Sequence, residues 1–285
     1  MIEYPAEFFD AKATLECGQV FRFTPSDDGF TLISDDKACF LSTRGDKTEI
    51  ITDDENYFSE YFDLKRDYGK IYSRVLSFNE DFLSIAAKSA KGVRILKQNL
   101  FETCASFIIS QNNNIARIKK IIENLSEECG KSFVFRGKTH YSFPTPENLA
   151  NLSLSDLKEA GLGYRCEYLK GFSEKVASGF DLHSLNLLST PLLTKELLKI
   201  KGIGKKVADC ITFFGYGRSD SFPVDTWIEK LYRENLGGKE TNREKISLEL
   251  VSRYGEFSGF CQQYLFYYKR SLEKLPHSDN NICKI

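Results

Sequence analysis

The sequence has 285 residues, of which 41% are hydrophobic and 28% are charged, and its formal net charge at pH 7 is −1. No run approaches the roughly eighteen apolar residues of a membrane-spanning helix, and the first residues, MIEYPAEFFD, lack the basic and apolar regions of a secretory signal. The eight cysteines form no CxxC pair and no two of the three histidines are four residues apart, so a disulfide framework, a zinc site and an iron–sulfur cluster are not expected. We expect an intracellular monomer without a cofactor.

Charge is distributed unevenly along the chain. Residues 1–64 contain fifteen acidic and five basic side chains, so this part carries −10 and the remainder carries +9. Residues 91–120 contain six basic side chains and one acidic side chain. A basic body is compatible with nucleic acid binding, although an ordinary solvated surface would show the same charge.

The first fifty residues predict antiparallel strands. Short β-rich runs alternate with turn residues, which is typical of a meander. The runs are QVFRF (19–23), FTLIS (30–34), ACFLSTR (38–44) and TEIIT (48–52). We therefore expect an N-terminal domain, residues 1–95, that contains an antiparallel sheet.

From about residue 54 onward the pattern is helical, and residues 96–285 are expected to form a helical body. Caps and stops divide this part into helices. Predicted starts are Asn99 with Glu102, Thr145 before Pro146, Thr190 before Pro191, and Thr241 with Glu244. Predicted ends are Gly130 and Gly255, and a last helix runs through FCQQYLFYYKR (260–270).

The stretch KGIG (201–204) lies between two helical runs, LLTKELLKI (192–200) and KKVADCITFFGYG (205–217). This arrangement predicts a helix–hairpin–helix whose glycines, Gly202 and Gly204, permit a tight turn. The amides at the start of the second helix would then favour an anion such as a DNA phosphate. A tight turn with no ligand is the alternative. A phosphate-binding P-loop is excluded because residue 206 would have to be Ser or Thr.

Helical phase separates the two lysines that follow the hairpin. Val207, Ile211 and Phe214 define the buried face of the helix. Lys205 points away from this face, to solvent or phosphate, whereas Lys206 lies at its border. A border lysine can be partly desolvated, which would lower its pKa and make its amine a nucleophile. An ordinary surface lysine is the alternative.

The stretch FPVDTW (222–227) supplies a candidate partner for Lys206. Pro223 precedes a predicted helix, and Asp225 is at its N-cap position. A chain that turns back after residues 215–217 would bring this carboxylate near the lysine. Simple helix capping is the alternative reading, and it is compatible with catalysis.

Together these two motifs resemble the helix–hairpin–helix DNA glycosylases with a Gly/Pro-rich loop and a terminal aspartate. Within that superfamily the chain is similar to the eukaryotic-type 8-oxoguanine DNA glycosylases over most of its length. The resemblance implies an α+β fold, in which a TBP-like sheet domain precedes an all-α body with the active-site cleft between helical subdomains. It also implies double-stranded DNA with oxidised guanine as the partner, and a possible cation on the carbonyls of Leu198, Ile200 and Ile203.

The resemblance assigns roles to residues near the lesion. Gly18, in CGQVFRF, matches the glycine whose carbonyl accepts a hydrogen bond from N7–H of the oxidised base. Gln262, in SGFCQQYLF, would bond the Watson–Crick edge of the base, and Phe266 would stack on its face. Lys206 matches the nucleophile, and the remaining two assignments are Cys210 as the base-stacking neighbour and Asp225 as the catalytic carboxylate.

Further residues match positions that contact the duplex. Asn112 and Arg117, in SQNNNIARI, would fill the vacated stack and contact the estranged cytosine. Tyr164 and Arg165, in GLGYRCEYL, would buckle the duplex and read cytosine. Trp227 departs from the pattern, because the animal enzymes have a histidine there.

These assignments predict a bifunctional 8-oxoguanine DNA glycosylase and AP lyase of base excision repair, acting preferably opposite cytosine through a lysine Schiff base. Two alternatives are weighed against it. A monofunctional alkylpurine glycosylase would use water and typically lacks a lysine at 206. A non-catalytic helix–hairpin–helix module would bind DNA without cleaving it.

Overall fold

The N-terminal part contains a five-stranded antiparallel sheet, and the computed structural model describes residues 1–274 of the chain. Residues 275–285, the end of the predicted body, lie outside the described part. The spatial strand order is β1 (Ile2–Pro5), β5 (Lys47–Thr52), β4 (Lys37–Arg44), β3 (Gly29–Ser34) and β2 (Phe23–Ser26). A side chain at Gly29 would meet the Leu41 carbonyl oxygen at 2.2 Å, so glycine is required where β3 begins.

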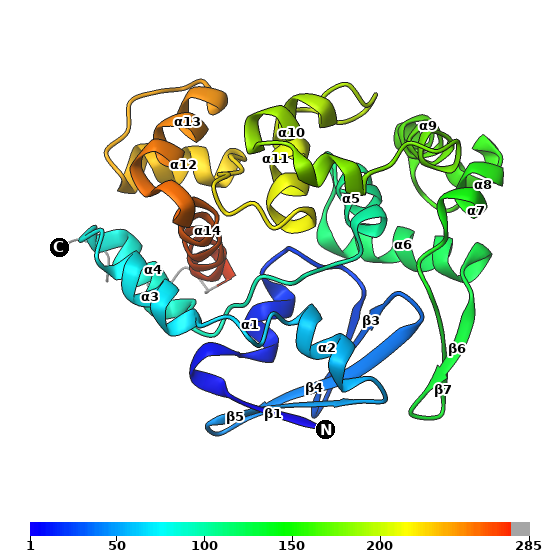
Figure 1. Cartoon of the computed structure of the whole chain (residues 1–285), viewed down its shortest axis with the longest axis horizontal. Coiled ribbons are helices and arrows are strands. Elements are labelled where there is room, and N and C mark those ends of the chain that lie inside the picture. The colour runs from blue at the N-terminus through cyan, green and yellow to red at the C-terminus, as the bar shows by residue number, and fades with distance from the viewer. Residues whose placement is uncertain (275–285) are drawn as a thin grey trace.

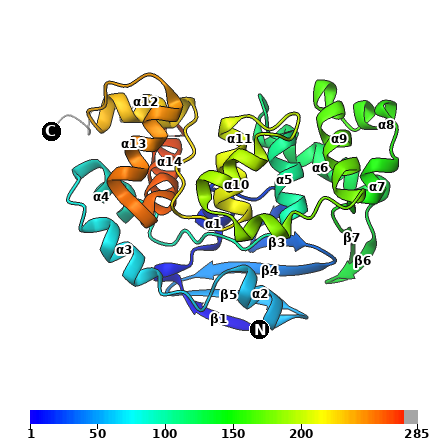
Figure 2. The same ribbon diagram turned by 45° about the horizontal axis from the view of Figure 1, so that its top comes forward.

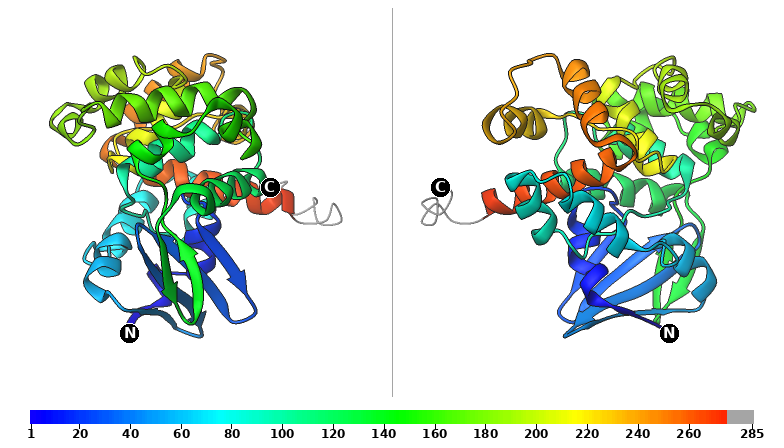
Figure 3. Two further views of the ribbon diagram at one scale, coloured as in Figure 1. Left: turned by 90° about the vertical axis from the view of Figure 1, so that its right-hand side faces the viewer. Right: turned by 60° about the vertical axis from the view of Figure 1, so that its left-hand side comes forward.

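The two faces of the sheet follow the period of two along its strands. Leu32, Leu41 and Ile50 point into a core that is completed by Phe9, which follows η1 (Ala6–Phe8), and by α1 (Ala11–Glu16) and α2 (Glu55–Tyr61) with the residues beside them. On the opposite face, Ile33 and Phe40 pack against Phe135. Phe135 belongs to a hairpin, β6 (Ser132–Phe135) and β7 (Lys138–Tyr141), that extends from the helical body along the sheet (Figure 3).

The helical body has two hydrophobic cores, and the helices that form them make two neighbouring groups (Figures 1 and 2). The first core contains α5 (Leu100–Ile109), α6 (Ile115–Cys129), α7 (Pro146–Asn151), α8 (Leu154–Glu159), η2 (Gly163–Arg165), α9 (Cys166–Ala177), η3 (His183–Leu187), α10 (Thr190–Leu197), α11 (Lys205–Cys210) and the π-helical turn η4 (Ile211–Gly215). The second contains α3 (Tyr68–Leu76), α4 (Asp81–Ser89), α12 (Thr226–Asn235), α13 (Arg243–Tyr254), η5 (Gly255–Phe257) and α14 (Ser258–Lys274). Helices α3 and α4 thus pack with α14, far away in the sequence (Figure 1).

The segment after α1 connects the sheet to both helical cores. Cys17 is buried in the second core and Phe21 in the first, so the residues between them lie where the two cores meet. Gln19 is 1% exposed, and its side chain donates to the Arg94 carbonyl at 2.7 Å and accepts from the Leu96 amide at 2.9 Å. This packing places Gly18 at the junction of the cores.

The predicted α+β fold, with a sheet domain before a mainly helical body, is confirmed. The structure contains the last three of the four predicted strands. It also has the predicted helix starts at Asn99 and Thr145 and the predicted helix ends at Gly130 and Gly255. The strand predicted at 19–23 is wrong, because only Phe23 joins the sheet and Gln19 uses its side chain to bind backbone groups of another segment.

Other differences concern short elements. Strand β1 and the β6–β7 hairpin were missed, so the body is not purely helical. The N-caps of α10 and α13 are Ser189 and Asn242, each one residue away from the predicted threonine. Within residues 1–274, none of the helices combines the length and apolar character needed to cross a membrane.

Candidate active site

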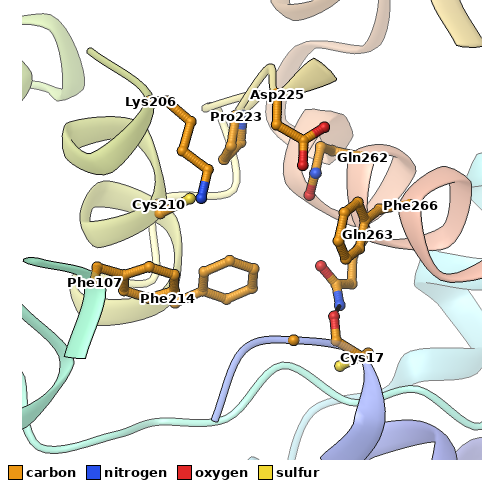
Figure 4. Close-up of a pocket in the computed structure, with 11 residues that line it drawn as sticks. Cys17, Phe107, Lys206, Cys210, Phe214, Pro223, Asp225, Gln262, Gln263 and Phe266 are labelled. Atoms are coloured by element: carbon orange, nitrogen blue, oxygen red, sulfur yellow. Dashed lines mark hydrogen bonds between the residues drawn. The ribbon is translucent and has the colours of Figure 1, made fainter. Parts of the chain in front are cut away.

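A cavity of about 350 Å³, including its mouth, lies where the two helical cores meet the segment after α1 (Figure 4). It is bounded by α5 and α11 on one side, by the loop before α12 and by α14 on the other, and by Cys17 and Gly18. Its lining residues are Cys17, Gly18, Phe107, Lys206, Cys210, Phe214, Pro223, Asp225, Gln262, Gln263 and Phe266. Six of the predicted site residues are therefore brought together in one place: Gly18, Lys206, Cys210, Asp225, Gln262 and Phe266.

The helix–hairpin–helix is present as predicted, with α10 and α11 joined by a tight turn. Gly202 has a φ of +91°, and a Cβ there would lie 2.4 Å from the ring of Tyr168, so only glycine fits. Gly204 is the N-cap of α11, and no side chain caps that helix start. The amides of its first turn are therefore available to an anion.

Lys206 reaches from the mouth of the cavity to its interior. The residue as a whole is exposed, but its amine lies inside, beside Cys210 and 5.9 Å from the centre of the Phe107 ring (Figure 4). The negative charge of ionised Cys210 and that of Asp225 raise the pKa of Lys206, against desolvation, which lowers it. The expectation of a lowered pKa is wrong, because two acidic groups outweigh the burial.

Burial also determines the protonation state of Cys210. Desolvation raises the pKa of this thiol to about 11, although Lys206 opposes the shift. The thiol is consequently neutral at pH 7, and Asp225 is the charged group beside the ammonium there. Lys206 must lose a proton before it can attack an electrophile.

Asp225 is held rigidly by the helix that it caps. Its Oδ1 accepts hydrogen bonds from the amides of Trp227 at 3.0 Å and Ile228 at 2.9 Å, as the N-cap position predicts. Figure 4 shows the carboxylate at the cavity beside Gln262, across from the amine of Lys206. Because both bonds go to one oxygen, capping leaves the other oxygen free to face a ligand.

Gln262 and Phe266 are one helical turn apart on α14 and lie on the side of the cavity opposite Lys206 (Figure 4). Gln262 is 5% exposed, and its Oε1 is buried without a hydrogen-bond partner among the described residues. An unpaired buried acceptor is costly, so its presence in a cavity indicates a missing donor. Gly18 has a φ of +87°, and a Cβ there would lie 3.4 Å from the Phe266 ring.

The residues predicted to contact the duplex lie outside the cavity, in two segments that touch each other. The side-chain amide of Asn112 donates to the hydroxyl of Tyr164 at 3.2 Å, and Arg117 donates to the Gly161 carbonyl at 3.1 Å. Tyr164 is 53% exposed. The two segments therefore form one edge, with exposed amide, phenol and guanidinium groups.

Arg165 differs from these neighbours because it is only 3% exposed. Its guanidinium donates to the carbonyls of Gln111 at 2.6 Å, Asn112 at 2.9 Å and Leu162 at 3.2 Å. In this structure Arg165 joins the two segments, and its predicted reading of cytosine stays a prediction.

Lys205 is also engaged within the protein. Its amine lies 2.6 and 2.7 Å from the two carboxylate oxygens of Asp209, one turn later on α11. Burial raises the pKa of Asp209 to about 6, and Lys205 lowers it. The predicted contact of Lys205 with DNA remains untested.

Metal sites built from side chains are not found: in residues 1–274, no three or more His, Cys, Asp or Glu residues are grouped so as to hold an ion. The predicted cation site on the carbonyls of Leu198, Ile200 and Ile203 stays a prediction. The carbonyl of Ile200 already accepts a hydrogen bond from the Ile203 amide at 3.0 Å.

The sequence missed five lining residues: Cys17, Phe107, Phe214, Pro223 and Gln263. The rings of Phe107 and Phe214 stack 5.6 Å apart, and their contact joins α5 to η4, which no local pattern reveals. Cys17 and Gln263 are the sequence neighbours of the predicted Gly18 and Gln262, and this proximity is the one feature of the sequence that could have indicated them as lining residues.

A lysine and an aspartate line one cavity beside a helix–hairpin–helix. Two family models show the class of protein to which this arrangement belongs. The model described as HhH-GPD superfamily base excision DNA repair protein matches residues 105–255. The model described as 8-oxoguanine DNA glycosylase, N-terminal domain, matches residues 1–104.

Individual relatives agree with these models. A probable N-glycosylase/DNA lyase of Methanothermobacter thermautotrophicus is 31% identical over 230 residues, 73% of this chain and 72% of the relative. N-glycosylase/DNA lyase OGG1 of Arabidopsis thaliana is 31% identical over 192 residues, 63% of this chain and 53% of the relative. The crystal structure of Clostridium acetobutylicum 8-oxoguanine glycosylase/lyase, in complex with dsDNA containing cytosine opposite to 8-oxoG, has a TM-score of 0.88 and 37% identity, and covers 93% of each chain.

The chain therefore belongs to the HhH-GPD superfamily of base excision DNA repair proteins and, within it, to the 8-oxoguanine DNA glycosylase family. The resemblance inferred from the sequence motifs is confirmed.

Proposed function

We propose that this protein is a bifunctional DNA glycosylase and AP lyase that excises 8-oxoguanine from double-stranded DNA in base excision repair. One observation carries the proposal: the amine of Lys206 and the carboxylate of Asp225 line one cavity whose far side presents Gln262 and Phe266. Such a cavity can receive a base that has been turned out of the duplex.

Chemistry begins when Lys206, an ammonium at neutral pH, loses a proton. Its amine attacks C1′ of the flipped nucleotide, and the glycosidic bond breaks with its electron pair going to the base, which takes up a proton. Asp225, ionised and fixed by two backbone amides, stabilises the positive charge that develops on the sugar. The C1′–O4′ bond of the resulting lysine adduct then breaks, O4′ takes up a proton, and C1′ and the lysine nitrogen form a Schiff base. Loss of a proton from C2′ to a base drives β-elimination, in which the C3′–O bond breaks and the 3′ strand leaves with its phosphate.

Recognition of the base rests on groups that surround it. The unpaired Oε1 of Gln262 accepts a hydrogen bond from a donor on the Watson–Crick edge. Phe266 and Cys210 lie on opposite sides of the cavity, where each can cover one face of the base (Figure 4). The Gly18 carbonyl accepts from N7–H, which 8-oxoguanine has and guanine lacks.

Outside the cavity, the edge formed by Asn112, Arg117 and Tyr164 contacts the gap and the estranged base, with a preference for cytosine. The uncapped amides at the start of α11, after Gly204, hold a phosphate of the lesion strand. The protein acts on this duplex as a monomer inside the cell, and it requires no cofactor.

Two alternatives fit the cavity less well. An alkylpurine glycosylase that uses water would leave the amine of Lys206 without a purpose at the point where the base would lie. A non-catalytic DNA-binding module would have no reason to place an ionised carboxylate opposite that amine.

Borohydride trapping on an 8-oxoguanine:cytosine duplex tests the proposal. The protein should form a covalent adduct with the DNA, and the Lys206→Gln variant should form none while still binding the duplex. Release of the base without an adduct would favour the alkylpurine mechanism, and binding without release would favour the non-catalytic module. Release of the base from a panel of duplexes with alkylated and oxidised bases separates these two alternatives.

A further inference from the structure

A second glutamine of α14, Gln263, forms a hydrogen bond to the wall of the cavity that contains Gly18. Gln263 is 1% exposed, and its side-chain amide donates to the Cys17 carbonyl at 2.9 Å, across 246 residues of sequence. Gln262 and Gln263 are consecutive on α14 and so point about 100° apart. Gln262 thus presents its oxygen to the cavity, while Gln263 binds the wall.

The other side of Gly18 is fixed independently by Gln19. The buried side chain of Gln19 donates to the carbonyls of Arg94 at 2.7 Å and Thr14 at 3.0 Å and accepts from the Leu96 amide at 2.9 Å. Gly18 lies between these two attachments with a φ of +87° and no side chain to hold it. The conformation of the Cys17–Gly18 peptide therefore depends on the bond from Gln263.

Two titratable groups lie beside this bond, and neither takes it over: Arg270 donates to the Glu16 carbonyl at 3.3 Å, and the Cys17 thiol is neutral at pH 7. Burial raises the pKa of the Cys17 thiol to about 11, although hydrogen bonds from Gln19 and Gln263 lower it. The thiol stays neutral, and the Gln263 amide remains available to the carbonyl.

We propose that Gln263 is a positioning residue for lesion recognition: it fixes the Cys17–Gly18 peptide and thereby directs the Gly18 carbonyl into the cavity. The inference rests on the proposed function, in which that carbonyl distinguishes 8-oxoguanine from guanine. Gln263 has no contact with the amine of Lys206 in this arrangement. It should therefore influence excision of the base, but not the lyase reaction at a site that has already lost its base.

The test compares two single-turnover rates in each protein, on an 8-oxoguanine:cytosine duplex and on the same duplex with an abasic site. Gln263→Met removes the donor and keeps an unbranched chain of similar volume. We expect the ratio of the first rate to the second to fall roughly five- to tenfold, with the abasic rate unchanged. Asn148→Leu is the matched control, because it removes a side-chain amide bond of 2.7 Å to the Cys129 carbonyl, remote from the cavity, and should leave the ratio unchanged.

A second variant keeps the inference testable if Gln263→Met unfolds. In Gln263→Glu the bond can form only when the carboxyl is protonated, so the ratio should fall between pH 6 and pH 8 more steeply than in the parent protein. An unchanged ratio in both variants, or an equal loss of both rates, would overturn the role of Gln263. Failure of the parent protein to cleave either duplex would instead refute the proposed function.

Discussion

Lys205 and Asp209 form a bidentate ion pair on the helix that also carries Lys206, with nitrogen–oxygen distances of 2.6 and 2.7 Å. The Asp209 side chain is 6% exposed and that of Lys205 is 34% exposed. The lysine beside Lys206 thus neutralises a buried carboxylate of the same helix.

Removing this pair should destabilise the protein most at neutral pH. Burial raises the pKa of Asp209 to about 6. As the pH rises from the ordinary pKa of an aspartate to neutral, ionisation of this carboxyl therefore already lowers the stability of the fold. Lys205→Gln raises that pKa further, and we expect a loss of about 1–2 kcal/mol at pH 7.5 and a smaller loss at pH 5.

Urea denaturation at both pH values measures this effect. Lys199→Gln is the control, because Lys199 pairs with Glu196 at the surface and should change stability little. If Lys205 contacts a DNA phosphate instead, the variant will keep its stability. The salt dependence of its DNA affinity will then correspond to the release of about one ion fewer.

Asp225→Asn should separate catalysis from helix capping. Asparagine caps a helix as well as aspartate, so the fold and the thermal midpoint should be retained. The charge that stabilises the sugar is lost, and we expect the single-turnover excision rate to fall by about a hundred- to a thousandfold. A variant of normal activity would show that Asp225 only caps α12.

The raised pKa of Lys206 predicts a pH-dependent reaction. Below its pKa, the fraction of neutral amine rises about tenfold per pH unit. The single-turnover rate of excision should therefore increase from pH 6 to pH 8, because the raised pKa of Lys206 lies above this range. A rate that is constant over this range would contradict an attacking lysine.

Arg117 and Arg165 should give opposite phenotypes although both were predicted to contact DNA. Arg117→Gln, at an exposed position, should leave stability unchanged and reduce the preference for cytosine over adenine opposite the lesion. Arg165→Gln removes three guanidinium hydrogen bonds to backbone carbonyls, among which that of Asn112 has no other donor in residues 1–274, and should lower the free energy of unfolding by about 2–4 kcal/mol. Urea denaturation and cleavage of the two duplexes distinguish these outcomes, and a stable Arg165→Gln variant would refute the structural role.

Some features of the site could be read from a few neighbouring residues. The cap at Asp225, the hairpin glycines and the direction of Lys206 depend on local helix geometry, which the sequence encodes within one or two turns. The structure places all of them as expected.

The features that were missed depend on contacts over long distances. The strand predicted at 19–23 is absent because Gln19 binds backbone groups near residue 95, and a local alternation of residues carries no information about that partner. The direction of the Lys206 pKa shift was likewise wrong, since it depends on which acids surround the amine and not on burial alone.

By itself, the sequence determined the class of fold, the helix–hairpin–helix, the position of Lys206 at the border of its helix and the cap at Asp225, because spacing and capping are local properties of the chain. Only the tertiary structure decided that Arg165 is buried, that Lys205 is ion-paired and that Gln263 holds the wall beside Gly18. Each of these contacts joins groups whose positions are fixed by the packing of two helical cores and a sheet.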